Sequence, residues 1–246
     1  MLLETSDRSE TYSFTIYNKS DLRQSYTLFS KAPNVEPAVQ HIASHAILVA
    51  RGIPPGDGIA TFVIQSHSFY AICGSMYQDE AAQMYALDRK PVKLGTGIGE
   101  GAKAGTTTCI LKASPDNPCS GSLEVVKQGE GKPGAFCIKT GAFHYKEAQS
   151  NGYMVALGLS TAPNAHVGVH ASFIPSPRTT YQITPSKVYY IVPTAFRANE
   201  VKPDEVDLSK AVQVDFSTAS LDVQIIHDNE NKLSIFSDVP FLTPKL

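Results

Sequence analysis

Short runs in which apolar and polar residues alternate recur along most of this chain. The run TYSFTIYN places Tyr12, Phe14 and Ile16 at every second position, and runs such as GIATFVIQ, HVGVHASFI and LDVQIIHD follow. A period of two is typical of strands, because successive side chains point to opposite faces of a sheet. Segments such as IPPGDG, GEGKPG and DNENK separate the runs and favour turns. The pattern predicts an all-β, mainly antiparallel fold, either a β-sandwich or barrel-like.

Helical patterns are sparse, and one to three short helices are expected. The segment QDEAAQMYALD (78–88) has acidic residues at its start, where the helix dipole favours them. The segment AFHYKEAQSNG (142–152) ends in Asn151-Gly152, a pair suited to capping a helix. The segment EPAVQHIASHAILVARG (36–52) fits a helix or a strand equally well. No linker of distinct composition divides the chain, so residues 1–246 are predicted to form a single domain.

Composition excludes some classes of partner. The 246 residues carry 21 basic and 23 acidic side chains, giving a formal charge of −2. Such a chain lacks the clustered basic residues of nucleic-acid-binding proteins, and no apolar run approaches the ~20 residues of a membrane helix. The start MLLETSDRSE has no basic, apolar leader pattern, which predicts a cytoplasmic protein. A secreted chain whose leader had been replaced by Met would begin in the same way.

The four cysteines are too few for a fold held together by disulfides. Cys73 and Cys137 lie inside apolar runs and are expected to be buried free thiols. Cys109 and Cys119 flank the turn-rich segment ILKASPDNP, which leaves a disulfide between them open.

The glycine-rich stretch KLGTGIGEGAKAGTTTCIL (93–111) raises the question of a phosphate-binding loop. Its glycines do not have the G-x-x-x-x-G-K-[ST] spacing of a P-loop. GEGAKA fits the looser G-x-G-x-x-A pattern, but that pattern binds a dinucleotide only where a helix follows. Here the strand-like TTTCILK follows. The stretch is therefore expected to be a structural connection, and a lid over a pocket between Gly95 and Gly105 stays open.

Two pairs of histidines share the spacing H-x-x-x-H, HIASH (His41, His45) and HVGVH (His166, His170). On a helix such a pair can share a zinc ion, whereas on a strand its members lie about 13 Å apart. The alternation in HVGVHASFI predicts a strand, and HIASH lacks the H-E-x-x-H pattern, so neither a metal nor another cofactor is expected. His166 and His170 are instead predicted to project from one face of a strand. There they become candidate acids or bases if that face lines a pocket, and ordinary surface histidines if it does not.

Aromatic and basic residues complete the candidate site. Tyr189 and Tyr190 are adjacent, so on a strand only one of them can line a given cavity. Tyr189 and Arg197 are proposed as hydrogen-bond donors beside His166 and His170, giving four catalytic candidates. The substrate-binding candidates are polar or aromatic residues with no linear motif around them: His67, Tyr70 and His144.

The strings YTLFSKAPNV, FYAICGS, YQITPSKVYYIV and AVQVDFS resemble those of small fungal β proteins that accompany secondary-metabolite gene clusters. Among these, the chain is similar to the intermolecular hetero-Diels–Alderase (pericyclase) type, which acts on tropolone-derived quinone methides. The resemblance implies natural-product biosynthesis by a cofactor-independent enzyme. It implies no particular catalytic residue.

Three functions are compatible with this sequence. The first is a cofactor-free cyclase, isomerase or pericyclase that binds a small apolar metabolite and holds it in a reactive geometry, with acid- or base-assisted loss of water. The second is a carbohydrate-binding, lectin-like sandwich, although the chain has no tryptophan for an aromatic platform. The third is a structural β protein without catalysis. A homodimer formed through exposed strand edges is possible in each case.

Overall fold

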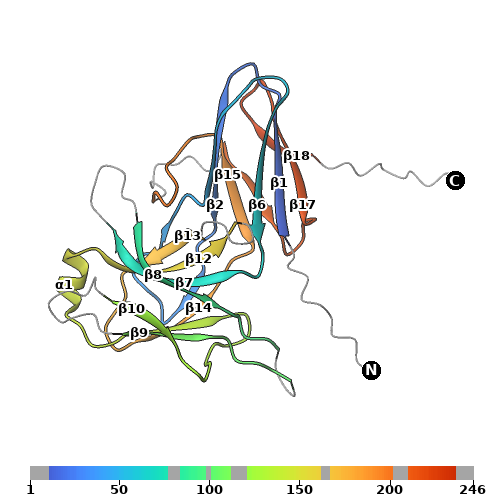
Figure 1. Cartoon of the computed structure of the whole chain (residues 1–246). Helices are drawn as coiled ribbons and strands as arrows, with labels where there is room; N and C mark the ends of the chain where they lie inside the picture. The colour runs from blue at the N-terminus through green and yellow to red at the C-terminus, as the bar shows by residue number, and fades with distance from the viewer. Residues whose placement is uncertain are drawn as a thin grey trace.

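The computed structural model describes residues 11–76, 84–97, 101–111, 121–161, 167–201 and 210–236. Within these ranges the chain forms eighteen strands and one short helix, arranged in four sheets (Figure 1). Most neighbouring strands are antiparallel, the exceptions being β1 with β17 and β9 with β11. None of the described sheets closes on itself. The predicted all-β, sandwich-like fold is confirmed.

Sheets A and B form the upper sandwich of Figure 1. Sheet A has the order β18-β17-β1-β6 and consists of β18 (Leu233–Phe236), β17 (Asp222–His227), β1 (Thr11–Asn18) and β6 (Gly58–Gln65). Sheet B has the order β16-β15-β2-β5 and consists of β16 (Val212–Asp215), β15 (Val188–Val192), β2 (Gln24–Ser30) and β5 (Leu48–Ile53). Aromatic rings meet between the two sheets: the ring centroid of Phe14 on β1 lies 5.8 Å from that of Tyr189 on β15.

Sheets C and D form the lower sandwich. Sheet C has the order β10-β9-β11-β14-β3 and consists of β10 (Ser122–Val125), β9 (Thr107–Leu111), β11 (Phe136–Lys139), β14 (Thr180–Thr184) and β3 (Asn34–Glu36). Sheet D has the order β4-β13-β12-β7-β8 and consists of β4 (Ala43–Ser44), β13 (Val167–Phe173), β12 (Tyr153–Ser160), β7 (Phe69–Met76) and β8 (Met84–Val92). Phe173 on β13 meets Tyr181 on β14, with ring centroids 5.0 Å apart.

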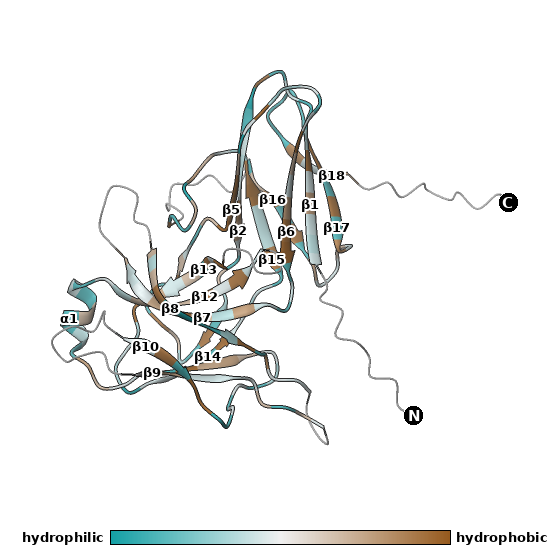
Figure 2. Cartoon of the chain, viewed as in Figure 1, coloured by the Kyte–Doolittle hydropathy of each residue, from teal (hydrophilic) through white to brown (hydrophobic). Residues whose placement is uncertain are grey.

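The two sandwiches share one hydrophobic core. A single cluster of buried side chains includes Phe14 of sheet A, Leu28 of sheet B, Phe136 of sheet C and Val155 of sheet D. The chain also passes between the sandwiches more than once. After β2 in the upper sandwich, β3 and β4 belong to the lower one, and β5 and β6 belong to the upper one again. Apolar residues are concentrated in the strands, while the helix is largely hydrophilic (Figure 2). The prediction of a single domain over residues 1–246 stays a prediction.

The helix α1 (Tyr145–Ser150) lies inside the segment 142–152 for which a helix was predicted. It ends at Asn151, and Gly152 follows with φ of +64°, so the predicted capping pair is confirmed. The helix predicted for 78–88 is wrong over residues 84–88, which form the first half of β8. Pairing with β7 overrides helical propensity there. Residues 77–83 lie outside the described part of the chain.

The ambiguous segment 36–52 is extended, forming β4 and most of β5. The predicted strand around HVGVH is confirmed as β13. The turn DNENK connects β17 to β18, which pair as an antiparallel hairpin. Cys73 and Cys137 are buried free thiols, as predicted. Cys119 lies outside the described residues, so its pairing with Cys109 stays open.

The glycine-rich stretch is a place where backbones pass close together. Gly105 pairs with Gly131 in an antiparallel bridge, and Gly95 pairs with Pro133 in a parallel one. A Cβ on Gly105 would lie 2.0 Å from the carbonyl oxygen of Ala135, which no side chain tolerates. The strand β9 follows this stretch instead of a helix, so its described residues do not lead into a helix N-terminus that could hold a phosphate. Residues 98–100 are not described, and a lid stays a prediction.

Candidate functional site

A cleft of about 680 Å³ opens beside α1, at the end of the lower sandwich. Segments far apart in sequence border it: the connection before β4, the ends of β7 and β12, α1, and the connection between β13 and β14. Its lining residues are Pro37, Ala38, Val39, Gln40, His41, Ala43, Met76, Tyr145, Gln149, Met154, Ile174, Ser176, Pro177, Thr179, Tyr181 and Val201. None of these carries a full charge, apart from a histidine that can be protonated. Ligand pockets commonly have this size and this largely apolar character.

The floor of the cleft is apolar and belongs to sheet D. Met154 on β12 is almost fully buried, and Met76 and Ile174 pack at the same small core cluster, on the face of the sheet opposite the main core. Met154 lies opposite Gly74 in the register of β12 and β7, where the backbone of β8 passes so close that a Cβ on Gly74 would lie 2.2 Å from the Tyr85 carbonyl oxygen. Methionine adapts its shape to irregular ligands, because its side chain is unbranched and polarisable.

One wall of the cleft is held by hydrogen bonds. The hydroxyl of Tyr181 accepts a bond of 2.7 Å from the backbone N–H of Ser176. The hydroxyl of Thr140 lies 2.7 Å from the carbonyl oxygen of Ser176 and 2.8 Å from the backbone N–H of Thr179. These contacts fix the connection between β13 and β14 before any ligand arrives. Preorganisation of this kind lowers the entropy that binding would otherwise cost.

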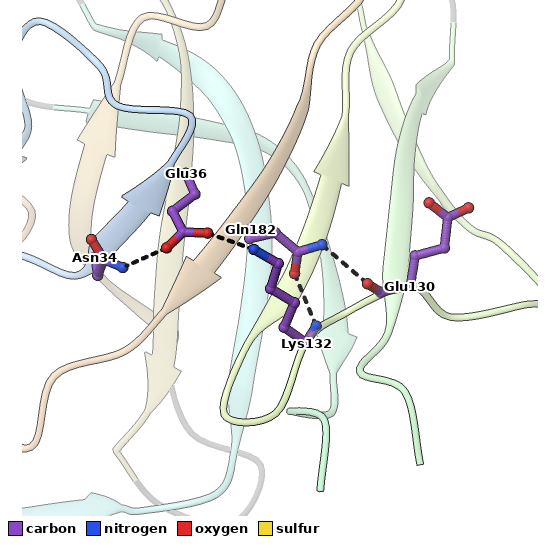
Figure 3. Close-up of polar contacts among 5 residues, drawn as sticks. All are labelled: Asn34, Glu36, Glu130, Lys132 and Gln182. Carbon is purple, nitrogen blue, oxygen red and sulfur yellow. Dashed lines mark hydrogen bonds and ion pairs between the residues drawn. The ribbon is translucent and has the colours of Figure 1, made fainter. Parts of the chain in front are cut away.

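The opposite rim of the cleft is the segment 37–41, which is mostly exposed. Glu36, the residue just before this segment, is held by hydrogen bonds. Glu36 Oε2 accepts a hydrogen bond of 2.7 Å from Lys132 Nζ, and Glu36 Oε1 lies 3.5 Å from Asn34 Nδ2 (Figure 3). Lys132 is held in turn through its backbone N–H, which donates to Gln182 Oε1 at 2.9 Å, and Gln182 Nε2 donates to the Glu130 carbonyl at 3.0 Å. The Lys132 ammonium lowers the pKa of Glu36. This exposed network attaches the rim to sheet C.

A buried histidine, His45, lies directly behind the cleft. It follows β4, whose Ala43 lines the cleft, and it forms an antiparallel bridge with Val201, which also lines the cleft. His45 Nδ1 lies 2.9 Å from the carbonyl oxygen of Asn199, and Nε2 lies 2.7 Å from Ser172 Oγ. A carbonyl can only accept, so Nδ1 carries the proton and Nε2 accepts from the serine hydroxyl. Burial lowers the pKa of His45 to about 4.

A second buried histidine, His170, occupies a β-bulge in β13. Leu157 pairs with Ala171 and Gly158 pairs with Val169, so His170 is the extra residue between two partners. Its side chain is directed at Tyr189, with ring centroids 6.2 Å apart. His170 Nε2 is buried without a hydrogen-bond partner among the described residues. Burial, reinforced by His45 nearby, lowers the pKa of His170 to about 3, so the ring is neutral over the physiological range.

Two of the residues predicted for the site lie together, and the others do not join them. His170 and Tyr189 meet in the core, where burial also raises the pKa of Tyr189. Arg197, His67 and His144 are exposed at separate places, and Tyr70 is half-buried beside the core cluster of sheet D. His166 lies outside the described residues. None of the described candidates is among the residues that line the cleft.

Sequence reasoning missed the residues that do line the cleft. His41 was considered only as a metal ligand, and Tyr145 entered only as part of the helical segment 142–152. A partial signal existed in that helix, because Tyr145 and Gln149 are four residues apart and therefore lie on one face. Nothing in the sequence indicates that this face meets the segment 37–41. That proximity arises from the pairing of β3 with β14.

The Ser172–His45 contact has the hydrogen-bond direction of an activated serine, but both side chains have an exposed fraction of 0%. In this arrangement the pair is a structural element behind the cleft rather than a nucleophile open to a substrate. The described residues contain no group of three or more His, Cys, Asp or Glu side chains that could hold a metal ion. No helix in the described part of the chain is long and apolar enough to cross a membrane.

Comparison of the whole chain with protein-family models, curated proteins and solved structures finds no match.

Proposed function

We propose that this protein binds a small, largely apolar organic molecule in the cleft beside α1. The observation that carries the proposal is the combination of about 680 Å³ of space, an apolar floor around Met154 and a described lining without carboxylates, lysines or arginines. A charged metabolite would find no counter-charge among the described lining residues. A neutral one would bury apolar surface against the floor, and each Å² removed from water favours binding by roughly 25 cal/mol.

We further propose that the bound molecule is converted by a cofactor-free cyclisation or isomerisation, such as a hetero-Diels–Alder reaction. Such chemistry needs reactants held in an attack geometry and a few donors that polarise a carbonyl. Tyr145 and Gln149 stand one helical turn apart at the cleft and are suited to donate to one carbonyl oxygen. His41 at the rim is suited to exchange a proton during loss of water from a precursor. The support for this step is the chemical nature of these side chains.

The proposal is tested by filling the cleft from α1. Gln149 is exposed and lines the cleft, so Gln149→Trp would occupy ligand space without entering the core. Glu147 is exposed on the same helix but does not line the cleft, so Glu147→Trp is a matched control. Thermal shift and calorimetry against neutral polyketides, terpenoids and tropolones would measure binding. We expect Gln149→Trp to weaken it at least tenfold and Glu147→Trp to leave it within twofold.

The panel also separates the alternatives. Simple sugars and oligosaccharides belong in the same screen, and binding of these alone would replace the proposal with a lectin-like function. Binding that both variants retain would place the ligand elsewhere on the surface. Absence of binding throughout the panel would favour a structural protein. Product analysis by chromatography and mass spectrometry then decides whether a bound metabolite is also converted, with Tyr145→Phe expected to slow conversion more than it weakens binding.

A further inference from the structure

Behind the cleft, His45 connects the end of β4 to the strand β13 and to the segment 199–201. Its backbone N–H donates to the carbonyl of His170 on β13, at 3.0 Å. Its Nε2 accepts from Ser172 on the same strand, and its Nδ1–H donates to Asn199 in the segment 199–201. The adjoining backbone adds two bonds of 2.9 Å, from Ala46 N–H to the Glu200 carbonyl and from Asn199 N–H to the Ala46 carbonyl. We call these contacts the His45 clamp.

The clamp holds two residues of the cleft in place. Ala43 is paired with Ser172 across β4 and β13, and Val201 is paired with His45 itself. Both Ala43 and Val201 line the cleft. Asn199 is further fixed by its side chain, whose Oδ1 accepts from the backbone N–H of Val169 at 2.9 Å. Release of His45 would therefore free the segment 199–201 and loosen one side of the cleft.

The surroundings of His45 do not accommodate a positive charge. The titratable side chains that face it are His170, itself buried and neutral, and beyond that Tyr189, whose phenol is also buried. On the turn that His45 contacts, the Glu200 carboxylate accepts from the backbone N–H of Arg197, and the Arg197 side chain is exposed. On β8, Asp88 Oδ2 accepts from the backbone N–H of Leu123. Among the described residues no carboxylate contacts either imidazole.

We propose that the His45 clamp is a pH-sensitive catch on the cleft, closed when His45 is neutral and released when His45 is protonated. This inference rests on the proposed function for its biological meaning, since loss of the wall would release the bound molecule in acid. Protonation puts a hydrogen on Nε2, so that Ser172 can no longer donate to it. It also places a charge beside His170 in a buried site whose described neighbours offer no counter-charge, which favours an open state where the imidazole is solvated.

Hydrogen exchange tests the catch without any ligand. The amides of His45, Ala46 and Asn199 report on the clamp, and the amide of Val155 in β12 reports on global unfolding. A pKa of about 4 in the closed state against 6.5 in a solvated state predicts that clamp opening rises about 30-fold between pH 7.5 and 5, after correction for intrinsic exchange. The amide of Val155 should change by a larger factor, because global unfolding also exposes His170, but at pH 7.5 it should open far less often than the clamp amides. Clamp amides that open only as often as Val155 would show that the clamp does not open separately from the rest of the protein. Clamp amides whose opening is the same at both pH values in the wild-type protein would overturn the proposal.

Two substitutions separate His45 from other histidines. His45→Asn keeps a donor near the position of Nδ1 and cannot titrate, so opening of its clamp amides should no longer depend on pH. If this variant does not fold, His45→Gln takes its place. In the control His41→Asn, at the exposed rim of the same cleft, opening of the clamp amides should still depend on pH. If a ligand has been found, its dissociation constant should rise in acid for the wild type and for His41→Asn, but not for His45→Asn. A cleft that binds nothing contradicts the proposed function, and hydrogen exchange alone then tests the catch.

Discussion

At position 170 a histidine occupies a site that a phenylalanine could fill. The bulge in β13 directs the imidazole into the core beside Tyr189, and Nε2 finds no partner there among the described residues. A buried polar atom without a partner loses its hydrogen bonds to water on folding, at a cost of roughly 1–3 kcal/mol. His45, by contrast, satisfies both ring nitrogens. His45 and His170 therefore differ in role, although burial lowers the pKa of both.

His170→Phe should accordingly stabilise the protein. The substitution removes the unpartnered nitrogen and keeps an aromatic ring next to Tyr189, so we expect the free energy of unfolding at pH 7 to rise by about 1 kcal/mol. Urea denaturation would measure the change. His144→Phe is the control, because His144 is exposed and its side chain makes no capping bond to α1. A loss of stability in His170→Phe would mean that His170 has a partner that the described residues do not supply.

At the scale of elements, the end of α1 is joined to the end of β7 by a glycine. Gly152 has a φ of +64°, and its carbonyl accepts from the backbone N–H of Met76 at 2.7 Å. A Cβ at position 152 would lie 2.2 Å from the Met76 carbonyl oxygen. Met76 and α1 both border the cleft. The glycine thus sets how closely the helix approaches the cleft floor.

Gly152→Ala should therefore destabilise the protein by more than the strain of a left-handed backbone conformation alone would cause. We expect it to lower the free energy of unfolding by about 3 kcal/mol, because strain at positive φ and the contact with Met76 both contribute. Gly56→Ala is matched in conformation, with φ of +80°, but its Cβ would meet nothing within 4 Å. It should cost about 1 kcal/mol. Equal losses in chemical denaturation would show that the Met76 contact can relax at no cost.

At the scale of the whole molecule, three buried histidines among the described residues link stability to pH: His45, His170 and His227. Burial lowers the folded-state pKa of each below the ordinary 6.5, to about 4 for His45 and about 3 for His170. The unfolded chain then binds more protons than the folded chain below pH 6.5. Stability is fully present above that value and is lost as pH falls from 6.5 through about 4.

Acid should therefore destabilise the wild-type protein well before its carboxylates titrate. A displacement of the His45 pKa from 6.5 to about 4 corresponds to a loss of about 3 kcal/mol between pH 7 and pH 4. Urea midpoints measured from pH 8 to pH 4 would show the decline. The double variant His45→Asn/His170→Phe should have a much flatter profile over that range. An unchanged profile in the double variant would assign the acid sensitivity to other groups.

The sequence by itself determined the elements whose signals are local. Alternation predicted the strands and hence the all-β class, and Asn151-Gly152 marked the end of α1, because side-chain direction and backbone conformation depend on near neighbours. Residues 84–88 formed a strand against their helical pattern, because pairing with β7 is a long-range contact.

Only the tertiary structure decided where the cleft lies and what faces it. It brought His41, Gln149, Met154 and Val201 to one place, and it buried His170 instead of opening it to a pocket. Those outcomes depend on strand order and on a one-residue bulge, neither of which leaves a trace in the periodicity of a single strand. A bulge redirects a side chain because it changes the register by one residue, and register is set by the partner strand.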